Sequence, residues 1–167
     1  MKAKALIWIL ILLLSISIVG CTEASSKAEG ELQKPASETQ NNDETTVNGV
    51  VENFGKKLQA VSLLAPEDVL EKSMQENYGE LVSPTLLEQW LKDPINAPGR
   101  LTSSPWPGRI EILSTEKVSE EAYEVKGEII EIADLEKKEI VAKRPITLRV
   151  EKIDGKWLIH HASIGEY

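Results

Sequence analysis

The chain has 167 residues, 41% of them hydrophobic, which is enough for one domain with a substantial core but too little for two large ones. Its 27 acidic side chains outnumber its 19 basic ones and leave a formal net charge of −8. A protein that binds nucleic acid needs a basic face, so this charge argues against a nucleic-acid partner. The single cysteine, Cys21, excludes an intramolecular disulfide and any metal cluster built on several cysteines.

Residues 1–20 have the layout of a secretory signal peptide. Lys2 and Lys4 precede an apolar run over residues 5–19 that only two serines interrupt, and no acid occurs before Cys21. The run is shorter than the roughly 20 apolar residues that a spanning helix needs. A permanent transmembrane anchor is therefore the weaker interpretation.

The leader ends in Ile18-Val19-Gly20-Cys21. This tetrapeptide indicates whether the mature protein is released or stays anchored to the membrane. Ordinary signal peptidase prefers small residues at −3 and −1, and a cut before Cys21 would place the bulky Ile18 at −3. The tetrapeptide instead resembles the lipobox of bacterial lipoproteins. That resemblance implies a diacylglyceryl group on Cys21, which becomes the mature N-terminus and anchors the protein to the extracytoplasmic face of the cell membrane. The alternative is that Cys21 merely ends the apolar segment.

Residues 21–46 are predicted to be the lipidated cysteine and a disordered stalk. Between residues 22 and 46 the only large aliphatic side chain is Leu32, aromatics are absent, and six acids face two lysines. Such a segment buries too little apolar surface to offset the entropy of ordering it. We expect the folded domain to span residues 47–167.

The first half of this domain has the pattern of three helices followed by a long irregular loop. Pro66 in a first turn indicates the second helix, and Ser83 as N-cap with Pro84 at N1 indicates a third that ends at Asp93-Pro94. A loop rich in Pro and Gly extends to Gly108. The first helix is indicated by apolar side chains at helical spacing: Val47, Val50, Val51, Phe54, Leu58 and Val61.

Apolar residues then alternate with polar ones, as in antiparallel strands, and Asp154-Gly155 is typical of a two-residue hairpin turn. This turn pairs Ile153 with Lys156 and, if the register continues, Leu148 with His161. His160 then faces the opposite side of the sheet. The predicted core face carries Ile146, Leu148, Val150, Trp157, Ile159, His161 and Ser163.

Three helices, an antiparallel meander and the closing stretch ITLRVEKIDGKWLIHHASI are together similar to the NTF2-like cone fold. The predicted class is α+β, with N-terminal helices packed on a curved antiparallel sheet. A cystatin-like fold is the main alternative, but its single helix leaves two helical segments unplaced. The resemblance implies a sheet that can leave a pocket on its concave side. Enzymes of this family, such as ketosteroid isomerase and polyketide cyclases, fill that pocket with Asp, Tyr or His, while other members bind ligands or partners.

His161 is the best candidate for a general base, because it falls on the predicted core face beside Trp157. No acid shares that face, so a hydrogen-bonded histidine at the sheet rim is the competing interpretation. The rings of His160 and His161 point to opposite sides and cannot chelate one metal together. No motif for a nucleophile, a phosphate loop, a metal or a cofactor occurs, and we assign no catalytic residue, metal or cofactor.

A tryptophan between two prolines is the most informative remaining feature. Trp106 lies in a stiff loop with Arg100 and Arg109 on either side, which is the composition of a binding anchor. The alternative is that Trp106 plugs the open end of the cone. Together with Trp157 and His161, these three residues are the candidate binding residues.

The leading hypothesis is a lipid-anchored, non-enzymatic module that binds an envelope protein or a small ligand. One alternative is an isomerase- or cyclase-like enzyme that uses the cone pocket. Another is a structural homodimer that pairs through the outer face of its sheet.

Overall fold

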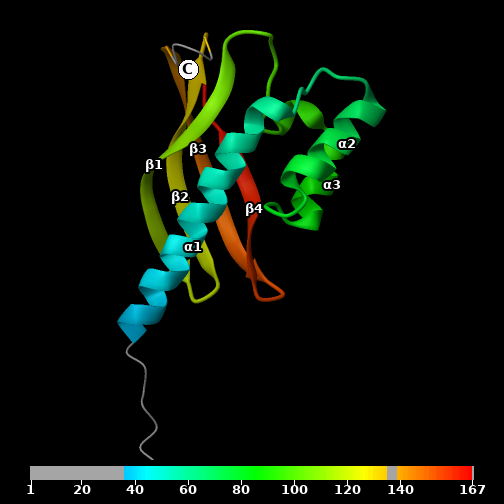
Figure 1. The fold of residues 1–167 in the computed structure, drawn as a ribbon. Helices are drawn as coiled ribbons and strands as arrows, with labels where there is room; N and C mark the ends of the chain where they lie inside the picture. The colour runs from blue at the N-terminus through cyan, green and yellow to red at the C-terminus, as the bar shows by residue number, and fades with distance from the viewer. Residues whose placement is uncertain (1–35, 135–138, 167) are drawn as a thin grey trace, which may run out of the picture. The chain divides into compact units, whose positions relative to one another are not determined.

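The computed structural model describes residues 36–134 and 139–166 (Figure 1). The predicted leader, the lipidation site Cys21 and the first part of the predicted stalk lie outside these residues. Among the described residues, no helix is both long and apolar enough to cross a membrane. The elements in chain order are α1 (Ala36–Lys57), η1 (Leu58–Ala60), α2 (Glu67–Tyr78), α3 (Pro84–Lys92), η2 (Pro94–Asn96), β1 (Trp106–Ser119), β2 (Ala122–Ile132), β3 (Ile140–Ile153) and β4 (Lys156–Ile164).

The four strands form one antiparallel meander in the order β1-β2-β3-β4. Figure 1 shows α1 running lengthwise along one face of the curved sheet, with α2 and α3 beside the C-terminal half of α1. This arrangement confirms the predicted α+β class with N-terminal helices on a curved antiparallel sheet. The cystatin-like alternative does not apply, since the described residues contain three α-helices.

The core lies between the helices and the concave face of the sheet. Phe54 of α1 is fully buried, and its ring lies 4.9 Å from Tyr78 of α2 and 6.0 Å from Trp90 of α3, measured between centroids. The helical spacing predicted from Val47 onward is confirmed, because Val47, Val51 and Leu58 join this core. Side chains of α1 and of the aromatic cluster thus pack against the concave side of the sheet.

The first helix begins earlier than predicted. It starts at Ala36, so residues 36–46, which we predicted to be disordered stalk, are helical. The carboxylate of Asp43 accepts a hydrogen bond from Trp157 Nε1 at 3.3 Å and lies 3.7 Å from Lys152 Nζ. The polar composition gave no sign of these first turns of helix, because polar contacts to the sheet hold them and no apolar stripe does.

The hairpin turn is confirmed, but the register changes within it. Asp154 and Gly155 both have positive φ, 50° and 79°, as this turn requires. Pairing follows the prediction from Ile153 and Lys156 as far as Val150 and Ile159, where a bulge follows.

Beyond the bulge the predicted face assignment is wrong for β4, whereas Ile146 and Leu148 of β3 are buried in the core as predicted. Arg149 pairs with His161 and Leu148 with Ala162, because an extra residue in one strand turns the following side chains over. Ala162 and Ile164 pack against the core, whereas His161 and Ser163 are exposed.

Candidate functional site

Two of the candidate binding residues line one surface cavity. Arg100 and Trp106 border a volume of about 440 Å³ together with Gln59, Ala60 and Ser103. Gln59 and Ala60 belong to η1, whereas the other three lining residues follow η2. The cavity therefore joins segments some forty positions apart in the chain. The chain spacing between Arg100 and Trp106 suggested their proximity, but the contribution of η1 had no signal in the sequence.

Backbone pairing fixes the position of Arg100. Its N–H donates to the carbonyl of Val61 at 2.8 Å, and its own carbonyl accepts from the N–H of Leu63 at 2.9 Å. Ser62 and Arg100 thereby form a short parallel bridge beside η1. The guanidinium is half-buried, and its Nε is buried without a hydrogen-bond partner among the described residues.

Trp106 lies at the start of a strand and not within the loop where we predicted it. It is the first residue of β1 and pairs with Ile132 of β2. The preceding turn is held by the hydroxyl of Thr102, which donates to the carbonyl of Pro105 at 2.9 Å. The indole is half-buried and forms part of the cavity wall. The alternative prediction, that Trp106 is a buried plug at the open end of the cone, is therefore wrong.

The cavity combines one cation with one flat aromatic surface. A guanidinium donates in a planar fork that matches carboxylate and phosphate oxygens. An indole offers a large rigid surface for a planar or apolar group. These two side chains can hold an anionic group and a flat group of the same ligand.

The other three candidates lie elsewhere. Arg109 is an exposed residue of β1, 4.0 Å from the carboxylate of Glu111, and does not line the cavity. Trp157 is buried, and its ring packs edge-on against Tyr123 with centroids 5.3 Å apart. His161 is exposed, so the general-base position predicted for it on the core face is not formed.

His160 is the histidine with a structural partner. Its Nδ1 lies 3.1 Å from the hydroxyl oxygen of Ser83, which also accepts from the N–H of Leu86 as the N-cap of α3. Its Nε2 lies 3.9 Å from a carboxylate oxygen of Glu151. Within the described ranges, no group of three or more His, Cys, Asp or Glu side chains is placed to hold a metal ion.

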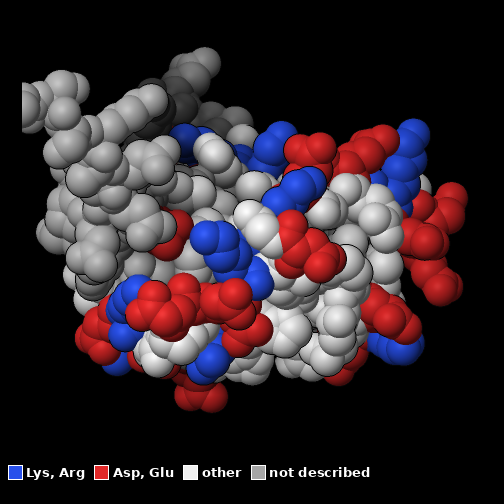
Figure 2. Space-filling view, turned by 90° about the horizontal axis from the view of Figure 1, so that it is seen from below, with Lys and Arg blue, Asp and Glu red and all other residues white. Residues whose placement is uncertain are grey.

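The outer face of the sheet carries paired charges. Lys143 lies 2.8 Å from Glu128 and 3.6 Å from Glu111, on neighbouring strands. At the end of the molecule seen in Figure 2, acidic and basic side chains are interspersed over the described residues. Such a surface is well solvated and offers no extended field for a polyanion.

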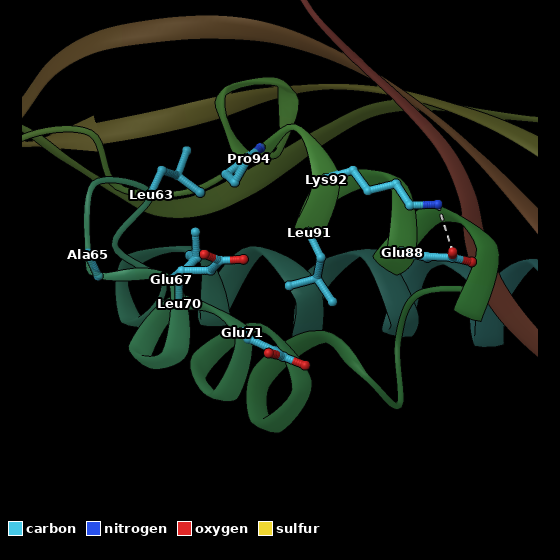
Figure 3. Close-up of a pocket in the computed structure, with 9 residues that line it drawn as sticks. All are labelled: Leu63, Ala65, Glu67, Leu70, Glu71, Glu88, Leu91, Lys92 and Pro94. Carbon is cyan, nitrogen blue, oxygen red and sulfur yellow. Dashed lines mark hydrogen bonds and ion pairs between the residues drawn. The ribbon is translucent and has the colours of Figure 1, made fainter.

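A second cavity, of about 490 Å³, lies between α2 and α3 and was not predicted (Figure 3). Its lining consists of Leu63, Ala65, Glu67, Leu70, Glu71, Glu88, Leu91, Lys92 and Pro94.

No protein-family profile matches the chain, and no curated protein matches it. Among solved structures it is similar to a variant named Rd1NTF2_05, with 11% identity and a TM-score of 0.40 over 75% of this chain and 99% of that one. It is also similar to an NTF2-like protein of unknown function from Shewanella oneidensis MR-1, with 17% identity and a TM-score of 0.35 over 77% of this chain and 99% of that one. These are likenesses of fold, and the assignment of the α+β class rests on the helices and sheet described above.

Proposed function

We propose that this protein is a lipid-anchored extracytoplasmic binding module, attached to the cell membrane through Cys21 and carrying out recognition without turnover. The observation that carries the proposal is the tetrapeptide Ile18-Val19-Gly20-Cys21 directly after a charged and then apolar leader. Two acyl chains anchor a protein stably, because each buried CH2 contributes about 0.8 kcal/mol.

The cavity of Arg100 and Trp106 is the proposed binding site. It is open at the surface, about 440 Å³ in volume, and lined by a cation and an aromatic ring. Pockets for small ligands have volumes of roughly 300–1,000 Å³. The ligand class that fits is a small molecule, or the end of a peptide, that carries a carboxylate or phosphate next to a planar apolar group.

The anchoring part is tested by Cys21→Ser. The expected result is loss of acylation and of processing after Gly20, because serine supplies no thiol for the lipid. Metabolic labelling with a fatty acid and membrane fractionation measure both effects, and Ser26→Ala in the same segment serves as the control. If the Cys21→Ser protein is still cut after Gly20 and stays with the membrane like the wild type, the anchoring proposal is wrong.

The binding part is tested with benzoate and its neutral isostere benzamide. Benzoate is expected to shift the NMR signal of the Trp106 indole N–H more strongly than benzamide does, because only benzoate can pair with the guanidinium. Arg100→Gln should remove the preference for benzoate, whereas Arg109→Gln, an exposed arginine outside the cavity, should keep it. Equal shifts from the two compounds, or equal loss in the two variants, would contradict the proposed site.

A further inference from the structure

The groove between α2 and α3 has an apolar floor. Leu70 of α2 and Leu63 before it are only 5% and 6% exposed, and Leu91 of α3 faces the same space. In Figure 3, Leu91 projects from α3 into the gap between the helices, while Leu63 and Pro94 close one end. Leu63 and Leu70 belong to the hydrophobic core and Leu91 packs against it, so the floor of the groove is an edge of the core that is open to the surface.

Two exposed apolar residues follow lining residues directly in the sequence. Leu64, which follows the lining residue Leu63, is 70% exposed, and Ile95, which follows the lining residue Pro94, is 60% exposed. Single exposed aliphatic residues are ordinary, whereas an apolar cavity lining that is open to the surface is typical of a site that binds another molecule.

The rim of the groove is acidic. Glu67 and Glu71 of α2 line it and make no salt bridge within the part of the chain that the structure describes. Glu88 of α3 lies 2.7 Å from Lys92, and both side chains are mostly exposed. An exposed pair of this kind contributes little, so Glu88 can exchange its partner for an incoming cation at small cost.

We propose that this groove docks a segment of a partner protein that presents bulky apolar side chains flanked by Lys or Arg. The floor accepts the apolar side chains and the acidic rim pairs with the cations, in the manner of an amphipathic helix laid into a groove. The acids oppose an anionic membrane surface and also a second copy of this acidic domain. The inference depends neither on lipidation nor on the cavity of Arg100 and Trp106.

The test uses labelled synthetic peptides and fluorescence anisotropy with the folded domain. One peptide places Leu and Lys at helical spacing, a second replaces each Lys by Glu, and a third replaces each Leu by Ser. We expect the Leu/Lys peptide to bind, and both others to bind at least about tenfold more weakly, a difference of about 1.4 kcal/mol. Binding of the Ser/Lys peptide as strong as that of the Leu/Lys peptide would overturn the proposal, because attraction of charge alone would then suffice.

Matched variants locate the binding surface. The double substitution Glu67→Lys with Glu71→Lys should weaken binding of the Leu/Lys peptide by about tenfold or more. Glu52→Lys with Glu76→Lys changes the net charge equally at exposed positions outside the groove, and should have a much smaller effect. Leu91→Ser tests the floor with no change in charge and should also weaken binding.

Equal loss in the two double variants, or no loss with Leu91→Ser, would overturn the proposal. Circular dichroism verifies that each variant is folded, and if the charge reversal unfolds α2, Glu71→Gln replaces it with the same expected direction. Sedimentation of the free domain provides a separate check, since a dimer that Leu91→Ser dissolves would mean that a second copy occupies the groove.

Discussion

The indole of Trp157 contacts both the sheet and the first helix. Its side chain is 6% exposed, packs edge-on against Tyr123, and donates to the carboxylate of Asp43. Trp157→Ala should lower the free energy of unfolding by about 3–5 kcal/mol, because it removes a large buried ring. The neighbouring Lys156 is exposed, and Lys156→Ala should change stability by less than about 0.5 kcal/mol. Urea denaturation compares the two variants with the wild type. Small and equal losses of stability in both variants would contradict the observed hairpin register.

Tyr78 links stability to alkaline pH. Its hydroxyl donates to the carbonyl of Pro98 at 2.7 Å, and burial raises the pKa of Tyr78 well above its ordinary value of 10.0. The unfolded chain therefore loses this proton before the native state does, so the stabilisation is complete below about pH 10 and declines above it. Tyr78→Phe should be less stable at neutral pH but should lose less stability between pH 9 and pH 11 than the wild type. Urea denaturation at several pH values measures this. If the free energy of unfolding of the Tyr78→Phe protein falls between pH 9 and pH 11 as steeply as that of the wild type, Tyr78 does not contribute to the pH dependence.

Individual residues show where the sequence predicts side-chain environment and where it fails. Trp157 was predicted correctly because only Lys156 separates it from the Asp154-Gly155 turn. His161 was predicted wrongly because a bulge lies between it and the turn. A bulge adds one residue to one strand and depends on how the sheet bends around its core, so alternation alone does not locate it.

At the scale of elements, α1 crosses β1 at a glycine. A Cβ atom added to Gly55 would lie 2.5 Å from the backbone nitrogen of Ile110, so the helix and strand approach closely there. Gly49 lies in the same helix, and a Cβ there would meet nothing within 4 Å. The two glycines lower helix propensity equally but differ in their surroundings.

The two alanine substitutions should therefore change stability in opposite directions. Gly49→Ala should raise the free energy of unfolding by up to about 1 kcal/mol through helix propensity. Gly55→Ala should lower the free energy of unfolding, because the backbone of β1 has to move to make room for the new Cβ. The cost of this movement exceeds the gain in helix propensity. Thermal denaturation measures both, and stabilisation by Gly55→Ala would show that α1 does not approach β1 this closely.

Elements with a local signal were predicted well. Ser83 caps α3 and the helix ends before Asp93-Pro94, because capping and proline geometry act over a few residues. The start of α1 was missed, since its first turns have no apolar stripe. Only part of the cavity of Arg100 and Trp106 was predicted. These two lining residues are near in sequence, whereas η1 is brought to the cavity by the pairing of Ser62 with Arg100.

At the scale of the whole molecule, the helical start of α1 sets how much chain the folded domain needs. Asp43 connects α1 to the hairpin of β3 and β4 through Trp157 and Lys152, and the Lys152 ammonium lies 5.3 Å from the Trp157 ring centroid. A domain that began at Val47, as the apolar pattern predicted, would keep the buried Val47, Val51 and Phe54 of α1 but lose this polar connection.

The last prediction compares two fragments, residues 36–167 and residues 47–167. The shorter fragment should fold but be less stable by about 1–3 kcal/mol, the range for a hydrogen bond to a charged group that leaves its partner unpaired. Asp43→Ala in the longer fragment should reproduce most of this loss, whereas Thr46→Ala, at an exposed position of the same helix, should not. Urea denaturation of the four proteins decides the matter. If residues 47–167 are as stable as residues 36–167, the contacts of Asp43 do not stabilise the domain, and residues 36–46 belong functionally to the stalk.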